Sequence, residues 1–117
     1  MLVPLGIDAW AQGSNRLATS ALVIGNSDQL AECAVSNRSN NSIRVDVQLI
    51  ANGAVFFSAE LNVLPNRTSI IDGNLPPGTE FFCKFRTFGN SARIRAAARV
   101  IDLSGTNNII PQRAEAR

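Results

Sequence analysis

Apolar and polar residues alternate with a period of two along most of this chain, in short stretches separated by turn residues. In the clearest stretch Ile43, Val45, Val47 and Leu49 share one phase, and the residues between them are polar. This period is typical of antiparallel strands with one face on a core and the other in water, because successive side chains of a strand point to opposite faces. The pattern predicts seven strands, at 19–25, 29–37, 42–51, 54–64, 68–72, 79–88 and 92–102.

The turns between these stretches favour one sandwich domain. Asn52-Gly53 separates the third and fourth predicted strands and suits a type I′ hairpin turn, in which both central residues need a positive φ. Seven strands, about a dozen residues apart, predict an all-β, two-sheet antiparallel sandwich of the immunoglobulin or fibronectin type III kind. We expect it at 19–103, after an N-terminal arm or truncated signal-peptide remnant at 1–18 and before a polar C-terminal tail at 104–117.

The phase of each predicted strand also predicts which side chains fill the core. Besides the third strand, the inward positions of the fourth, sixth and seventh strands are expected to be Val55, Phe57, Ala59, Leu61, Val63, Phe81, Cys83, Phe85, Ile94, Ala96, Ala98 and Val100.

Cys33 and Cys83 are the only two cysteines, and each lies in an apolar phase of a predicted strand. Two buried thiols in a reducing compartment are one interpretation. Their placement in two separate strands of a sandwich favours the other, a disulfide between the sheets and an oxidising compartment. We therefore expect the protein to be secreted, periplasmic or on the cell surface.

Two stretches of sequence carry a resemblance to known sandwiches. Leu75-Pro76-Pro77-Gly78-Thr79-Glu80-Phe81 resembles the entry to the penultimate strand of fibronectin type III domains, with Phe81 at the tyrosine position. More broadly, residues 18–102 are similar to small secreted bacterial proteins that have a signal peptide, one β-sandwich and two such cysteines. The resemblance lies in six short stretches: Ala18 to Val23, Glu32 to Asn37, Asn52-Gly53, Pro76 to Gly78, Phe82 to Phe85 and Ile94 to Ala97. The resemblance implies a compartment and a fold, and it supplies no catalytic residue.

The composition argues against an enzyme. The chain has no His and no Tyr, so the commonest general base and metal ligand is missing, and a serine nucleophile would have only Lys84 beside it as a base. Neither a cofactor nor a metal is expected. The formal net charge of +2 predicts no wholesale attraction to nucleic acid, and no apolar run approaches the roughly 20 residues that span a bilayer.

Charge is uneven near the end of the predicted domain, where five cations and no acid lie between Lys84 and Ile101. We expect the last two strands to form a hairpin beside the third, which would gather one cationic outer face from Arg44, Lys84, Arg86, Arg93, Arg95 and Arg99. One interpretation is that the long side chains cover the sheet and keep the protein in solution. The other is a docking face for an acidic protein, a polysaccharide or nucleic acid, the last being least expected because outward aromatic residues do not accompany the arginines.

Apolar residues outside the predicted core suggest a second surface. Phe56 and Phe82 fall in outward phases, and the arm carries further apolar side chains at Leu2, Val3, Leu5, Ile7 and Trp10. The arm could cover the two rings within its own molecule, or it could add a strand to a neighbouring copy and form a dimer or a fibre.

These observations predict a non-catalytic secreted or surface module that acts by protein contact, as a structural or assembly subunit whose partner includes copies of itself. The alternative is a recognition domain that binds an anionic partner through the arginine-rich sheet face.

Overall fold

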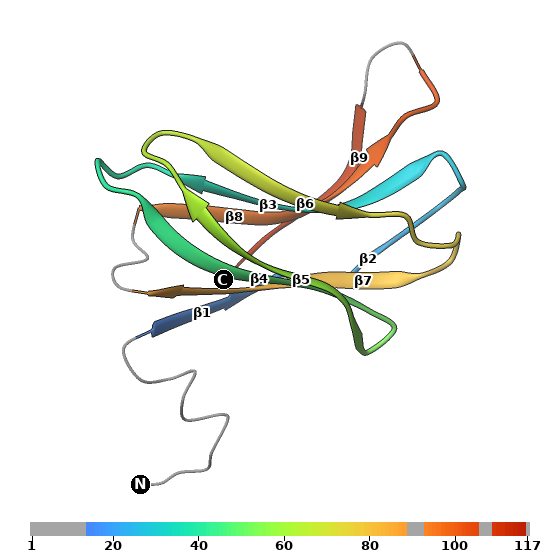
Figure 1. The fold of residues 1–117 in the computed structure, drawn as a ribbon. Helices are drawn as coiled ribbons and strands as arrows, with labels where there is room; N and C mark the ends of the chain where they lie inside the picture. Colours follow the sequence, from blue (N-terminus) through green and yellow to red (C-terminus); the bar gives the residue numbers. More distant parts are fainter. Residues whose placement is uncertain (1–13, 89–92, 106–108, 117) are drawn as a thin grey trace, which may run out of the picture.

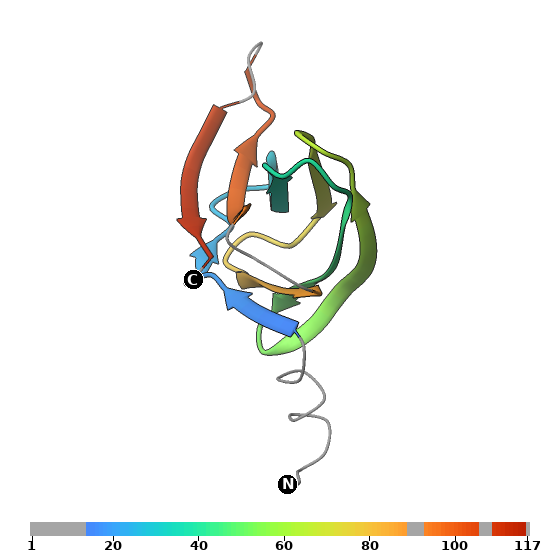
Figure 2. The same cartoon turned by 90° about the vertical axis from the view of Figure 1, so that its left-hand side faces the viewer.

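The chain folds into two antiparallel sheets packed face to face (Figures 1 and 2). The computed structural model describes residues 14–88, 93–105 and 109–116, which form nine strands and no helix. Sheet A has the order β1-β7-β4-β5, with β2 also paired to β7; its strands are β1 (Ser14–Ala18), β2 (Leu22–Val23), β4 (Ile43–Ala51), β5 (Ala54–Val63) and β7 (Glu80–Phe88). Sheet B has the order β6-β3-β8-β9; its strands are β3 (Gln29–Asn37), β6 (Thr68–Gly73), β8 (Ile94–Asp102) and β9 (Ile109–Glu115).

The all-β sandwich is confirmed, and the seven predicted strands correspond to β2 through β8. Two further strands lie where we expected an arm and a tail. β1 occupies the end of the 1–18 segment and pairs with β7, and β9 occupies half of the 104–117 segment and pairs with β8. Half of the expected polar tail is therefore an edge strand of sheet B.

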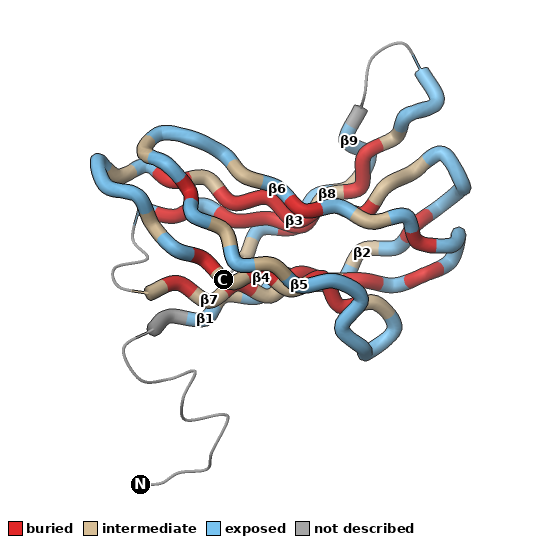
Figure 3. The backbone as a smooth tube through the Cα atoms, in the orientation of Figure 1, coloured by how far each residue is buried: buried red, intermediate tan, exposed pale blue. Residues whose placement is uncertain are grey.

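A disulfide joins the two sheets through the middle of the core. Cys33 of β3 and Cys83 of β7 are bonded to each other, and neither is exposed to solvent. The predicted inward residues of β4, β7 and β8 belong to the core, where all but the partly buried Ile43 are buried. Buried residues are red in Figure 3. The disulfide is consistent with an oxidising, extracytoplasmic location.

The inward phase predicted for β5 is wrong at Val55, which is 53% exposed, whereas Phe57 lies opposite the buried Leu49 and keeps the predicted phase, although it is 46% exposed. Phe57 pairs with Leu49, but Val55 pairs with Ile50, so the register shifts by one residue at a β-bulge and Val55 turns to the outer face. Phe56 is the extra residue. It was expected to point outward, but its ring lies against Gly73 at the end of β6, where an added methyl group would come within 2.7 Å of the ring.

The connection after β7 differs from the expected hairpin. In immunoglobulin sandwiches the last two strands are neighbours in one sheet. Here β8 belongs to sheet B and pairs with β3 and β9, and the place beside β7 is taken by β1. The consequence is that cations expected on one face lie on two opposite faces of the sandwich.

Candidate functional site

The six cations predicted to share one face are divided between the two sheets. Sheet A carries Arg44, Lys84 and Arg86, and sheet B carries Arg95 and Arg99, with Arg93 just before β8. The side chains do point away from the core, as the alternation predicted, because their neighbours in sequence are buried. The single cationic face is wrong, since it depended on a pairing of β7 with β8 that does not exist.

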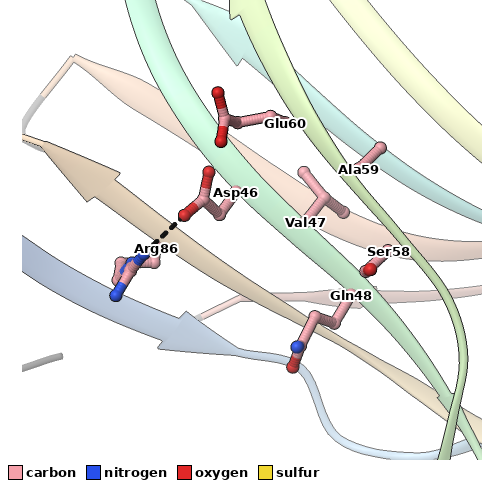
Figure 4. A pocket seen from close by; sticks show the side chains of 7 residues that line it. All are labelled: Asp46, Val47, Gln48, Ser58, Ala59, Glu60 and Arg86. Atoms are coloured by element: carbon pink, nitrogen blue, oxygen red, sulfur yellow. Dashed lines mark hydrogen bonds and ion pairs between the residues drawn. The ribbon is translucent and has the colours of Figure 1, made fainter. Parts of the chain in front are cut away.

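On the outer face of sheet A, acidic residues of the same sheet hold the arginines. Arg86 donates to Asp46 at 2.6 Å, as Figure 4 shows beside a shallow hollow. Arg44 lies 3.0 Å from Glu60 and 3.7 Å from Asp46. These contacts join β4, β5 and β7, so they bind the sheet together rather than offering free charge to a partner.

The ring of Phe88 lies against the two arginines of these ion pairs, a contact that was not predicted from the sequence. Phe88, at the end of β7, lies under both guanidinium groups, with its centroid 4.4 Å from the Arg44 Cζ and 4.8 Å from the Arg86 Cζ. Both distances lie within the range of cation–π attraction. The signal was present in the sequence, because the outward phase of Phe82, Lys84 and Arg86 continues to Phe88.

Two arginines of sheet B are also engaged. Arg99 of β8 forms an ion pair with Glu32 of β3, whose side chain is only 9% exposed. Arg113 of β9 lies 2.5 Å from Glu115 of the same strand. Arg99 was predicted to belong to a binding face, and its guanidinium is instead committed to a buried acid.

The remaining arginines form a group that we call the arginine cluster: Arg38, Arg67, Arg93 and Arg95. All four are exposed, and none has an ion pair with any residue in the part of the chain that the structure describes. Arg95 donates only weakly, at 3.4 Å, to the carbonyl of Ile94. The cluster is the largest concentration of cationic charge without an acidic partner among the described residues.

Strand pairing brings the cluster together at one end of sheet B. The backbone N–H of Arg38 donates to the carbonyl of Arg93 at 2.8 Å, and the N–H of Asn37 donates to the carbonyl of Arg67 at 2.9 Å. Arg95 lies opposite Ser36 in the β3–β8 ladder. Arg38 and Arg67 could not be assigned to this group from the sequence, because they lie in turns whose positions depend on which strands pair.

A buried asparagine, Asn37, fixes the turns that present Arg38 and Arg67. The Asn37 side-chain amide donates to the carbonyls of Asn41 and Val63, at 2.7 and 2.9 Å. Its carbonyl oxygen accepts from the backbone N–H of Ser39 at 2.8 Å. Asn66, in the second turn, has a φ of 57°, a conformation that asparagine tolerates better than most residues. Arg38 and Arg67 are therefore mounted on turns held by internal hydrogen bonds.

Two adjoining hollows, of about 350 and 360 Å³, lie beside the cluster and share Ser36, Arg38 and Thr68. The first is completed by Asn37, Asn66 and Arg67, and the second by Ala34, Arg95, Ala96, Ala97, Arg99, Arg113 and Glu115. Together they make one shallow depression on the outer face of sheet B, which we call the sheet B trough. Each volume is at the lower end of the range for small-molecule sites.

One carboxyl group has a perturbed pKa, and it lies away from the trough. The hydroxyl and backbone N–H of Ser104 donate to Asp102 and hold the pKa of that carboxyl below its usual value. Asp102 ends β8, whereas the cluster lies at the start of that strand. This contact shapes the loop that follows β8 and supplies no acid or base near the arginines.

The predicted apolar surface does not form one patch. Phe82 is half-buried on the outer face of sheet A beside Ile50, whereas Phe56 lies toward Gly73 of the other sheet. The arm residues Leu2, Val3, Leu5, Ile7 and Trp10 lie outside the described residues. Their role in assembly, like that of the two rings, stays a prediction.

Comparisons with known proteins add a likeness of fold. No family model and no curated protein matches the chain. A crystal structure of the Thermotoga maritima protein 1070 is similar, with a TM-score of 0.61 over 91% of this chain and 95% of that chain at 7% sequence identity. At that identity the likeness shows the sandwich architecture alone. Within the described ranges, no helix is long and apolar enough to cross a membrane.

Proposed function

We propose that this protein is a secreted, non-catalytic binding module that recognises an anionic partner through the arginine cluster. The observation that carries the proposal is the location of Arg38, Arg67, Arg93 and Arg95: all four are exposed, lack an acidic partner among the described residues, and lie at one end of sheet B. The charged groups on sheet A, by contrast, include arginines that are paired with acids of their own sheet.

The choice of arginine supports the same conclusion. A guanidinium offers a planar fork of N–H donors that matches a carboxylate, sulfate or phosphate in a bidentate manner. The cluster holds four such groups and no lysine. Because Arg38 and Arg67 lie on turns with internal hydrogen bonds and Arg95 lies on β8, little backbone order remains to be imposed there by the partner.

Binding to dextran sulfate tests the proposal. We expect the double variant Arg38→Gln/Arg67→Gln to bind at least tenfold more weakly than the unaltered protein at about 50 mM salt, because each phosphate- or sulfate-type contact contributes mainly through counterion release. The slope of log affinity against log salt should fall by about one for each arginine removed. Isothermal titration calorimetry over a series of salt concentrations measures both quantities.

A matched control separates local contact from net charge. The variant Arg16→Gln/Lys84→Gln also removes two positive charges, but from sheet A. We expect it to reduce the affinity for dextran sulfate by less than about threefold, as a change in long-range attraction alone would. Equal weakening by both double variants would refute the arginine cluster as the binding site.

Assembly is a second candidate function, favoured by the edge strand β5. This strand has ten residues, pairs with β4 alone among the described strands, and exposes Val55, Phe56 and Phe57 at its start. An exposed apolar edge can pair with another chain. If the N-terminal arm mediates this, the full chain should be larger than its 12.5-kDa monomer by sedimentation, at low and high salt alike, and removal of residues 1–11 should yield the monomer. A monomeric full chain would rule this function out.

A further inference from the structure

The sheet B trough extends well beyond the arginine cluster, and its shape bears on what the cluster binds. It runs from the turn containing Asn66 and Arg67 to β9, where Arg113 and Glu115 line its far side. It thereby crosses all four strands of sheet B, a distance of about 14 Å at the usual spacing of neighbouring strands. A depression of that length suits an extended ligand better than a single small anion.

The floor and walls of the trough differ in chemistry. The floor is formed by the side chains of Ala34 and Ala97, which lie side by side on β3 and β8 and are 8% and 2% exposed. The arginines that line the trough come from two turns, at Arg38 and Arg67, and from strands β8 and β9, so they are supplied by elements across the whole width of the sheet. This arrangement fits a ligand that repeats its acidic groups along its length.

Neutral polar groups lie between the arginines. The hydroxyls of Ser36 and Thr68 are 2.7 Å apart and either can donate to the other, which leaves further hydrogen-bonding capacity toward the trough. The Glu115 carboxylate also lines the wall. It can accept hydrogen bonds from hydroxyls and would repel a chain that is acidic at every position. The lining therefore suits a ligand in which acidic groups alternate with hydroxyls.

These features distinguish between classes of polymer. Of the residues that the structure describes, no aromatic one lines the trough, so it offers the bases of a single-stranded nucleic acid no ring on which to stack. An acidic peptide usually gains affinity from an apolar pocket or from pairing with a free strand edge. The trough offers a floor of alanines on the face of a sheet, and the backbone of β3 and β8 beneath it is already paired on both sides.

We infer that the sheet B trough binds a linear acidic polysaccharide, an inference that rests on the proposed function. Arg38, Arg67 and Arg95 would hold its carboxylate or sulfate groups, and the hydroxyls of Ser36 and Thr68 would meet its sugar hydroxyls.

The test compares polyanions of different chemistry on the full chain. The probes are polygalacturonate, dextran sulfate, poly-glutamate of matched charge, a single-stranded oligothymidylate and neutral dextran, each titrated at about 150 mM salt, where screening weakens exposed charge–charge attraction. We expect one of the two acidic polysaccharides to bind at least tenfold more tightly than poly-glutamate and the oligothymidylate, and neutral dextran to bind least.

The double variant Ser36→Ala/Thr68→Val tests the trough without changing its charge. Because both partners of one hydrogen bond are removed together, we expect the fold and its thermal midpoint to be largely retained. Affinity for the preferred polysaccharide should fall about fivefold or more, and affinity for poly-glutamate should change by less than twofold. A matched control, Ser58→Ala on sheet A, should alter neither.

The outcomes separate this inference from the proposed function. If all polyanions bind in proportion to their charge, or poly-glutamate or the oligothymidylate binds best, the polysaccharide inference is wrong and the anion-binding function stands. If no polyanion binds above neutral dextran, both are wrong. An unchanged polysaccharide affinity in the folded Ser36→Ala/Thr68→Val variant would show that the hydroxyls take no part, and would overturn the inferred mode of binding.

Discussion

The double variant Cys33→Ala/Cys83→Ala is expected to lose about 4 kcal/mol of free energy of unfolding, since the bond closes a loop between residues 50 apart in sequence and so restricts the unfolded chain. Small domains are stable by only about 5–15 kcal/mol in total, so the variant should be near the limit of folding. The effect should be large because the two cysteines lie at the centre of the core and join strands of opposite sheets.

Urea unfolding of the oxidised protein and the double variant measures this loss, with the slope of free energy against urea compared as well as the midpoint. Substituting both cysteines avoids leaving one unpaired thiol. Ala98→Gly is a suitable control, because Ala98 lies opposite Cys33 in the β3–β8 ladder and is equally buried, but its substitution leaves the bond intact. If the double variant loses less than about 1 kcal/mol, the bond is not a principal source of stability.

The strands that face the core could be predicted from sequence because alternation records burial directly. β4, β7 and β8 each present a row of apolar side chains to the core, so their phases follow from the positions of residues such as Val47, Phe85 and Ala98. The bulge in β5 could not be predicted in this way. A single extra residue reverses the phase of everything beyond it, and nothing in the alternation marks where that residue lies.

The strands at the sheet edges were missed for a different reason. Among the described strands, β1 and β9 each form a ladder with a single neighbour, and β9 contains Pro111, which cannot donate to a ladder. Such strands carry a weak apolar pattern. They are specified by pairing with β7 and β8, which is a property of the assembled sandwich.

Outward arginines and an anionic partner could be predicted from the sequence, but not which arginines lie together. The outward phase of Arg93 and Arg95 followed from alternation, and an anionic partner followed from their charge. Their neighbours did not, since Arg38 and Arg67 join them only because β3 pairs with both β6 and β8. An outward arginine forms an ion pair only if its cross-strand neighbour is acidic, and the sequence alone does not show which residues are neighbours. The ion pair of Glu32 with Arg99 is the clearest case.

That ion pair leads to the second prediction with a large effect. Glu32 and Arg99 have side chains that are 9% and 22% exposed, and the Arg99 Nε is buried without a hydrogen bond to a described residue. We expect Arg99→Met to lower the free energy of unfolding by about 2–3 kcal/mol, below the usual 3–5 kcal/mol for a fully buried pair because part of the arginine reaches solvent. The loss would arise from leaving the Glu32 carboxylate in a dry environment with no cation beside it.

Two variants distinguish this cause from loss of packing alone. Glu32→Met/Arg99→Met removes both charges, so we expect it to unfold within about 1 kcal/mol of the unaltered protein, because replacing a buried pair by apolar side chains is often neutral. Arg113→Met breaks the pair with Glu115, whose side chains are 53% and 47% exposed, and should cost less than about 1 kcal/mol. Urea unfolding of all three variants completes the comparison. If the double variant is no more stable than Arg99→Met, the uncompensated carboxylate is not the cause, and Arg99 stabilises the sheet through the packing of its side chain.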